Sequence, residues 1–220
     1  MSPFFIDRQD AGRRLGAAMP LRYHKRDDVI VLGLPRGGVP VAWQVAAALS
    51  APLDVLAVRK LGLPGNSEFA MGAIAPGGIT ILDERVISGM GASPQAIETV
   101  LEAEQKELDR RQRRYRGARP PLALAGQTVI LVDDGLATGS TMQAAVAAAR
   151  RESAAAVVVA VPVASMEARE ILAGQADDII ALFTPRLFQA VGQWYAKFPQ
   201  TSDEEVDRLL VGFRPGTGKR

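Results

Sequence analysis

The sequence predicts an α/β fold with a parallel-sheet core and flanking helices, and two observations support this. Short apolar runs at residues 29–32, 129–132 and 155–161 have the length and composition of strands that are buried on both faces. Each run is followed by a turn and then by a helical pattern. Strand, loop and helix in alternation are typical of a parallel sheet with right-handed crossovers.

The composition restricts the class of protein. A chain of 220 residues with 48% hydrophobic content suits a single domain over residues 1–220 with a sizeable core. We expect a cytoplasmic protein with no membrane segment, because the chain has no apolar run of 18 residues and no secretory leader pattern. The absence of cysteine excludes disulfides and thiolate metal sites, and a single histidine argues against a Ser-His-Asp hydrolase.

The first strand is expected to lead into an anion-binding loop. An amphipathic helix over residues 7–19 precedes the strand at 29–32, and a helix over 39–49 follows it. Between them, Gly37 and Gly38 allow a close approach of the backbone to an anion, and Arg36 supplies a forked cation. The alternative is a glycine-rich turn with a solvated arginine.

A strand at 54–58 should be followed by an irregular, mobile loop at 59–68, because glycine, proline and asparagine are concentrated there. Arg59 and Lys60 lie at its base and Glu68 at its far end, a distribution that suits a lid over an anionic ligand. The alternative is a solvent-facing loop with incidental charges. Strands at 69–74 and 79–82 then form a hairpin.

A long helix should begin with Ser93 as its N-cap and Pro94 at its first position. Its end is strongly basic, which suits a solvated helix C-terminus and leaves RNA binding as the alternative. The arginines concerned are Arg110, Arg111, Arg113, Arg114, Arg116 and Arg119.

The most informative segment is residues 129–142, where a buried strand ends in Asp133 and Asp134 and a helix follows. Two carboxylates at the carboxyl end of a parallel strand suit sugar hydroxyls or a cation. The turn Thr138-Gly139-Ser140-Thr141 offers hydroxyls and backbone N–H groups to a phosphate. Together they predict a site for a ribose 5-phosphate. The alternative is that the two aspartates are ordinary turn and N-cap residues.

This segment resembles the signature of the type I phosphoribosyltransferases, which bind 5-phosphoribosyl 1-diphosphate (PRPP). The resemblance implies that Asp133 and Asp134 hold the ribose hydroxyls. It also implies a 5-phosphate loop formed by Ala137, Thr138, Gly139, Ser140 and Thr141. The diphosphate would be bound by Pro35, Arg36, Gly37, Gly38, Arg59 and Lys60, with a non-proline cis peptide between Pro35 and Arg36.

The resemblance has further implications for catalysis. Segment 59–68 is similar to the catalytic loop of adenine-type members, in which Lys60 and Glu68 would be catalytic together with the aspartate pair. Mg²⁺ would be bound through PRPP and water, since it prefers oxygen ligands and retains its waters. Ala137 stands where hypoxanthine and guanine enzymes carry an acidic residue, so adenine, uracil, orotate or an unconventional acceptor stay open.

The core is expected over residues 27–185, with a helix at 166–172 and a last strand at 178–183. Residues 186–213 concentrate aromatic residues and end in a helix that Ser202 and Glu205 cap. The aromatics are expected to seal one end of the sheet. Alternatively, they form the hood that receives the acceptor in this family, with Trp194 or Tyr195 stacking on it.

The resemblance therefore implies a Mg²⁺-dependent phosphoribosyltransferase of nucleotide salvage, which is expected to form a homodimer. It would transfer the phosphoribosyl group from PRPP to a nitrogen nucleophile, with a nucleobase expected, and release diphosphate. A weakly catalytic nucleotide sensor that binds RNA through the basic helix end is the alternative from another class. Phosphate-ester chemistry or phosphorolysis of a phosphoribosyl compound is a third.

Overall fold

The computed structural model describes residues 4–117, 119 and 121–213, with only the backbone described at 67–69. Its centre is a five-stranded sheet in the order β2-β1-β6-β7-β8, with every neighbouring pair parallel. This confirms the predicted fold class. The strands are β1 (Val29–Gly33), β2 (Leu53–Val55), β6 (Thr128–Val132), β7 (Ala156–Val163) and β8 (Asp178–Phe183).

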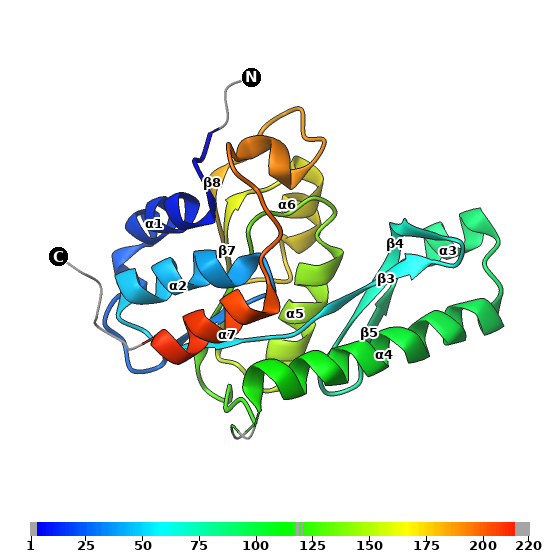
Figure 1. The fold of residues 1–220 in the computed structure, drawn as a ribbon, viewed down its shortest axis with the longest axis horizontal. Coiled ribbons are helices and arrows are strands. Elements are labelled where there is room, and N and C mark those ends of the chain that lie inside the picture. Colours follow the sequence, from blue (N-terminus) through cyan, green and yellow to red (C-terminus); the bar gives the residue numbers. More distant parts are fainter. Residues whose placement is uncertain (1–3, 118, 120, 214–220) are drawn as a thin grey trace.

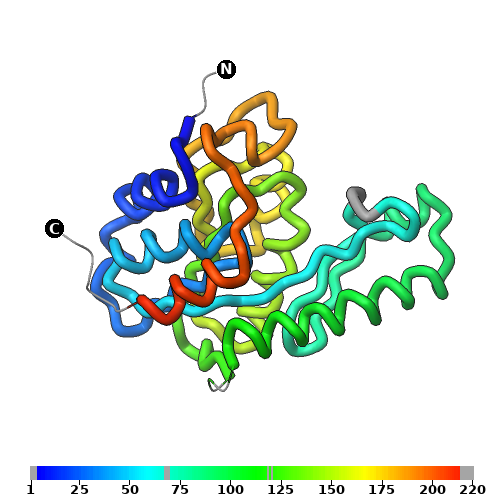
Figure 2. The backbone as a smooth tube through the Cα atoms, in the orientation of Figure 1, coloured from blue at the N-terminus to red at the C-terminus, as the bar shows by residue number. Residues whose placement is uncertain are grey.

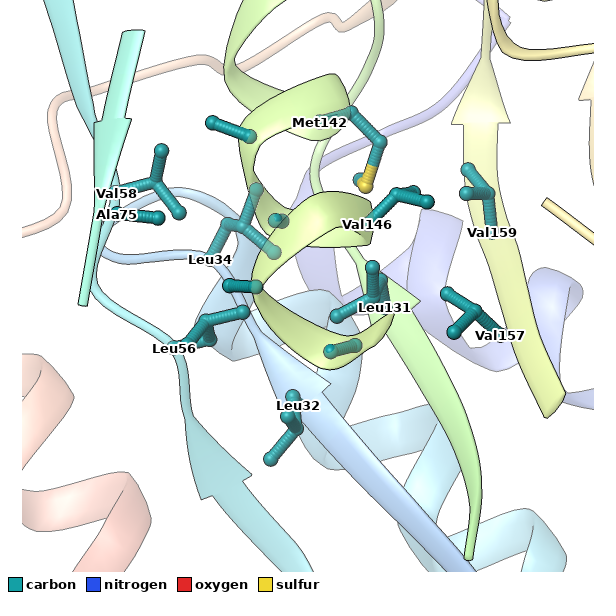
Figure 3. Packing of buried hydrophobic residues seen from close by; sticks show 14 of the residues in the cluster. Leu32, Leu34, Leu56, Val58, Ala75, Leu131, Met142, Val146, Val157 and Val159 are labelled. Atoms are coloured by element: carbon teal, nitrogen blue, oxygen red, sulfur yellow. The ribbon is translucent and has the colours of Figure 1, made fainter. Parts of the chain in front are cut away.

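Helices cover both faces of this sheet (Figure 1). Helices α1 (Arg8–Ala18) and α2 (Gly38–Leu49) pack on one face through residues such as Leu15 and Val45. Helices α5 (Ser140–Arg151) and α6 (Met166–Leu172) cover the other face. There Met142 and Val146 of α5 meet Leu131 and Val159 of the strands (Figure 3). Because successive side chains of a strand point to opposite faces, β1, β6, β7 and β8 each contribute to both cores.

A second, antiparallel sheet projects from the body as an arm (Figures 1 and 2). It consists of β3 (Arg59–Leu63), β4 (Asn66–Ala75) and β5 (Ile79–Leu82), followed by α3 (Glu84–Met90) and the long α4 (Pro94–Arg116). Leu61, Met71 and Leu108 form the core between the arm sheet and α4. Ser93 caps α4 and Pro94 opens it, as predicted.

The arm corrects one prediction. Residues 59–68 are not an irregular loop, because β3 and the start of β4 form a hairpin there. Pro64 and Gly65 form the turn of this hairpin, and Gly65 adopts φ +79°. The register between the two strands shifts on both sides of Gly62, so β3 accommodates this glycine as an irregularity. The predicted strand at 54–58 is also shorter than expected, because β2 ends at Val55.

The N-terminal segment and the segment that follows β8 meet beside that strand. Phe5 pairs with Tyr195 in an isolated bridge, and an aromatic cluster forms around them. The short helices η1 (Leu21–Tyr23) and η2 (Val191–Trp194) belong to these terminal regions. Helix α7 (Asp203–Gly212), which Ser202 caps as predicted, lies against α2 (Figure 2).

None of the helices in the described ranges combines the length and the apolar character that crossing a membrane would need.

Candidate functional site

The sheet has a topological switch point between β1 and β6. Gly33 and Val132 are register partners at the ends of these two strands, and the Leu34 N–H donates to the Val132 carbonyl at 2.9 Å. The chain leaves β1 toward α2 on one face and leaves β6 toward α5 on the other. The loops after β1 and β6 therefore border the same crevice, which is where open α/β sheets bind ligands.

A cavity of about 170 Å³ lies beyond the end of β6. Asp133 lies on one wall of this cavity, and the predicted phosphate loop and the start of α5 form the rest. The residues that line it are Asp133, Gly135, Leu136, Ala137, Thr138, Gly139, Ser140, Thr141, Met142 and Val191. Backbone N–H groups at the start of α5 and three hydroxyls are thus available to an anion in this cavity.

Helix α6 supports the phosphate loop from behind. The Ser165 hydroxyl donates to the Ala137 carbonyl at 2.6 Å and accepts from the Ala168 N–H at 2.9 Å, so one side chain ties the loop to the start of α6. Gly139 adopts φ +80°, and a Cβ there would lie 3.3 Å from the Ala168 methyl group. No local pattern in the sequence indicates the role of Ser165, because its partner lies 28 residues away.

The structure separates the two aspartates. Asp133 lines the cavity, and one of its oxygens accepts the Asp134 N–H at 2.8 Å. The Asp134 carboxylate contacts Gly37 and accepts the Arg8 Nε–H through Oδ2 at 2.7 Å. The Tyr195 hydroxyl donates to the Asp134 carbonyl at 2.6 Å. Burial, and then the neighbouring charge of Asp134, raise the pKa of Asp133.

Arg8 is the residue that sequence reasoning missed. It comes from the first turn of α1, 126 residues from Asp134, and its side chain is only 11% exposed. Spacing cannot reveal such a pair. The sequence does indicate that some cation is needed, because two adjacent buried carboxylates require one nearby if both are ionised. It does not indicate which residue supplies it.

The loop after β1 lies against the end of β6. The peptide bond between Pro35 and Arg36 is cis, as the resemblance implied. Gly38 packs so closely on the end of β6 that a Cβ there would lie 2.6 Å from the Val132 carbonyl oxygen. Only glycine fits this position, which keeps the loop against the Asp133 backbone.

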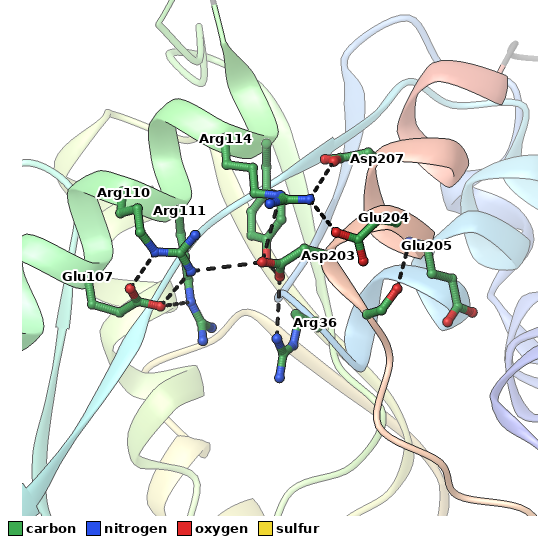
Figure 4. A network of polar contacts seen from close by, with 11 residues as sticks. Arg36, Glu107, Arg110, Arg111, Arg114, Asp203, Glu204, Glu205 and Asp207 are labelled. Atoms are coloured by element: carbon green, nitrogen blue, oxygen red, sulfur yellow. Dashed lines mark hydrogen bonds and ion pairs between the residues drawn. The ribbon is translucent and has the colours of Figure 1, made fainter.

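Asp203 of α7 is the centre of a polar network that includes Arg36 (Figure 4). The Arg36 guanidinium lies 3.4 Å from the Asp203 carboxylate, which also accepts the Tyr115 hydroxyl. Arg110 and Arg114 of α4 lie 3.9 and 3.7 Å from the same carboxylate. These hydrogen bonds and cations lower the pKa of Asp203.

Arg59 and Lys60 are not among the residues that line the cavity. Arg59 donates to Glu104 of α4 at 2.6 Å, and Lys60 is exposed on β3. Glu68 falls in β4, but its side chain lies outside the described part of the structure. The hairpin therefore directs Arg59 toward α4. The prediction of an open loop had placed this side chain at the ligand instead.

The alternative stacking role of Trp194 and Tyr195 is not supported. Each is only 5% exposed, within a cluster that includes Phe5 and Phe198. The Tyr195 ring centroid is 4.8 Å from that of Phe198 and 5.3 Å from that of Phe5. Because neighbouring rings already cover them, these side chains seal the end of the sheet, as expected from the sequence.

The basic end of α4 is largely neutralised within the described chain. Arg110 and Arg111 both contact Glu107, which lowers the pKa of Glu107 to about 2. Arg114 contacts Glu204 and Asp207 at 2.8 and 3.3 Å, and Arg116 and Arg119 both contact Asp54. These ion pairs favour the interpretation of a solvated helix end over that of an RNA-binding surface.

The fold and the site define a class: α/β proteins that bind a phosphate-bearing ligand at the switch point of a parallel sheet. Residues 17–174 match the phosphoribosyl transferase domain family. The chain belongs to this family.

Two relatives from Mycobacterium tuberculosis, of strains H37Rv and CDC 1551, are each 48% identical to the chain over 206 residues. Both are provisionally named phosphoribosyl transferases. The match covers 94% of this chain but 46% of each relative, so the chain spans just under half of their length.

A solved structure has the same fold. The crystal structure of TT1426 from Thermus thermophilus has a TM-score of 0.77 with this chain at 43% identity. The match covers 94% of this chain and 97% of that one.

Proposed function

We propose that the chain catalyses Mg²⁺-dependent transfer of the 5-phosphoribosyl group from PRPP to a nitrogen nucleophile, with a nucleobase expected, and releases diphosphate. The observation that carries the proposal is the cavity at the end of β6. It combines one carboxylate, Asp133, with a hydroxyl-rich loop at a helix N-terminus, beside the loop that follows β1. Membership of the phosphoribosyl transferase family supports the same reaction.

In this proposal the phosphate loop anchors the substrate. The N–H groups and hydroxyls from Ala137 to Thr141 hold the 5-phosphate, since a helix N-terminus favours negative charge. Asp133 and Asp134 hold the ribose hydroxyls. Fixing both ends of the phosphoribosyl group places its C1 carbon between the two loops, where an incoming nucleophile can be aligned with it.

The chemistry breaks the bond between C1 and the diphosphate oxygen and forms a bond from C1 to nitrogen. Positive charge develops on the sugar while negative charge accumulates on the departing diphosphate. The carboxylate pair stabilises the first charge, and Arg36, with the N–H groups of Gly37 and Gly38, receives the second. Arg59 and Lys60 are proposed to assist diphosphate binding, which requires the β3–β4 hairpin to approach the site.

The donor set fits Mg²⁺, which binds carboxylate, hydroxyl and water oxygens. Asp133 lines the cavity, and within the described ranges no basic side chain forms an ion pair with it. Mg²⁺ would be bound through the oxygens of PRPP and through water, as the resemblance implies. When bound, Mg²⁺ offsets the negative charge of the diphosphate.

The acceptor is proposed to be a base other than a 6-oxopurine, in a nucleotide salvage reaction. Ala137 is exposed beside the cavity and offers no carboxylate to such a base. Trp194 and Tyr195 are covered, so we propose that the acceptor is recognised at the mouth of the cavity without stacking on these two rings.

Diphosphate release across a panel of adenine, uracil, orotate and simple amines tests the proposal. We expect release with one acceptor in the presence of PRPP and Mg²⁺, and its loss in Asp133→Asn and Asp134→Asn. Release of ribose 5-phosphate without an acceptor would indicate hydrolysis instead. If the protein binds RNA strongly and releases no diphosphate with any acceptor, the proposed activity is wrong and the RNA-binding regulator is the better interpretation.

A further inference from the structure

Arg8 of α1 contacts both the Asp134 carboxylate and the segment that precedes α7. Its Nε–H donates to Asp134 Oδ2 at 2.7 Å, and its Nη1 donates to the Pro199 carbonyl at 2.6 Å. The guanidinium carbon lies 3.7 Å from the centroid of the Phe198 ring. Helix α1 and the segment before α7 thus fix this cation against the end of β6.

The surroundings of the carboxylates make this cation necessary. Asp133 and Asp134 are adjacent and partly buried, and two like charges at such a site oppose each other's ionisation. The titratable groups that face them are Arg8 from α1 and the Tyr195 phenol, whose pKa burial raises. A protonated phenol carries no charge, so among the described residues Arg8 alone offsets the pair through an ion pair.

We infer that Arg8 is a positioning residue of the site: its guanidinium lets Asp133 and Asp134 be ionised together and fixes the orientation of the Asp134 carboxylate. This inference rests on the proposed function, since the ionised pair is what holds the ribose hydroxyls. With Oδ2 bound to Arg8 and packed on Gly37, only Oδ1 of Asp134 is left for a hydroxyl.

Arg8 lies outside residues 17–174, the part of the chain that matches the family. The contact therefore adds to the site a residue that the family match does not include. It also gives the α1 helix a function beyond covering the sheet, because α1 supplies the counter-charge on which PRPP binding depends.

The experiment is the pH dependence of PRPP affinity in the full chain, measured by calorimetry with Mg²⁺ for the native protein, Arg8→Met and Arg8→Lys. An opposite charge nearby lowers a carboxyl pKa by roughly 1–3 units, so Arg8→Met should move the acid limb of binding up by about one pH unit or more. Arg8→Lys keeps the charge and should move it less. Titration of PRPP itself is common to all variants.

Arg14→Met is the matched control. Arg14 lies on the same helix, donates to the Phe4 carbonyl at 2.7 Å and rests on the Phe4 and Phe5 rings, away from the carboxylates. Its removal should leave the acid limb in place. If Arg8→Met lowers affinity by the same factor at every pH, or has no effect, the inference is wrong.

A second readout needs no PRPP. Infrared spectra at neutral pH should show a protonated carboxyl band in Arg8→Met that is absent from the native protein and from Arg8→Met combined with Asp133→Asn. No such band in Arg8→Met would overturn the charge role of Arg8. Failure of the native protein to bind PRPP would instead refute the proposed function, while the infrared result still decides the charge role.

Discussion

The contact between Gly37 and the Asp134 carboxylate predicts that Gly37→Ala is strongly destabilising. A Cβ at residue 37 would lie 2.0 Å from Asp134 Oδ2 and 3.2 Å from Arg8 Nε. Gly37 has φ −62° and ψ −31°, a conformation that alanine adopts readily. Any loss of stability therefore comes from the lack of space and not from the backbone.

The size of the effect follows from this distance. Ordinary contacts begin at 3.4 Å, so Oδ2 must retreat by about 1.4 Å, half the length of its 2.7 Å bond to Arg8. Overpacking costs typically about 1–3 kcal/mol, and breaking a buried ion pair about 3–5 kcal/mol. Because both side chains keep some exposure, we expect a loss of about 2–4 kcal/mol in the free energy of unfolding.

Urea unfolding measures this loss, and calorimetry with PRPP measures its effect on the site, where affinity should fall as well. Gly89→Ala is the control, because nothing lies within 4 Å of a Cβ there and the residue is helical. It should be neutral or stabilising by up to about 1 kcal/mol. If Gly37→Ala unfolds with the same free energy as the native protein and binds PRPP with the same affinity, Asp134 does not pack on this loop as described.

Three further predictions follow from contacts of the site. Burial holds the pKa of Asp133 above its unfolded value, so its ionisation opposes folding increasingly as pH rises through the folded pKa. Asp133→Asn should therefore raise the free energy of unfolding at pH 7 while abolishing PRPP binding, and a loss of stability would contradict the sign. Ser165→Ala should cost about 1–3 kcal/mol and weaken ribose 5-phosphate binding, whereas Ser93→Ala, a cap remote from the cavity, should lose only about 1 kcal/mol and bind normally. Asp203→Asn should release Arg36 and so tighten the binding of inorganic diphosphate, measured by calorimetry. Asp207 contacts Arg114, so Asp207→Asn should leave that affinity unchanged. Equal affinities in the two variants would show that Asp203 does not restrain Arg36.

Much of the fold was predictable because buried parallel strands have a strong sequence signal. The apolar runs that predicted β1, β6 and β7 needed no tertiary information, and neither did the caps Ser93 and Ser202. The arm was harder. Glycine and proline in residues 59–68 indicate a break in regular structure, but pairing with β4 and burial of Leu61 and Leu63 against α4 override that local preference.

The candidate site was predictable where its residues are consecutive. The phosphate loop and Asp133 lie within nine residues, so one motif contains them. Residues that approach from elsewhere left no such pattern. Arg8 and Ser165 reach the site through α1 and α6, and the restraint of Arg36 by Asp203 joins positions 167 residues apart. Their roles depend on tertiary packing, which spacing along the chain does not encode.

The most direct test of the central claim is a crystal structure of the chain with PRPP and Mg²⁺. We expect the 5-phosphate in the loop from Ala137 to Thr141, with a ribose hydroxyl on Asp133 and the diphosphate beside Arg36. A cavity that stays empty at saturating PRPP, or a substrate bound elsewhere on the molecule, would contradict the proposed function.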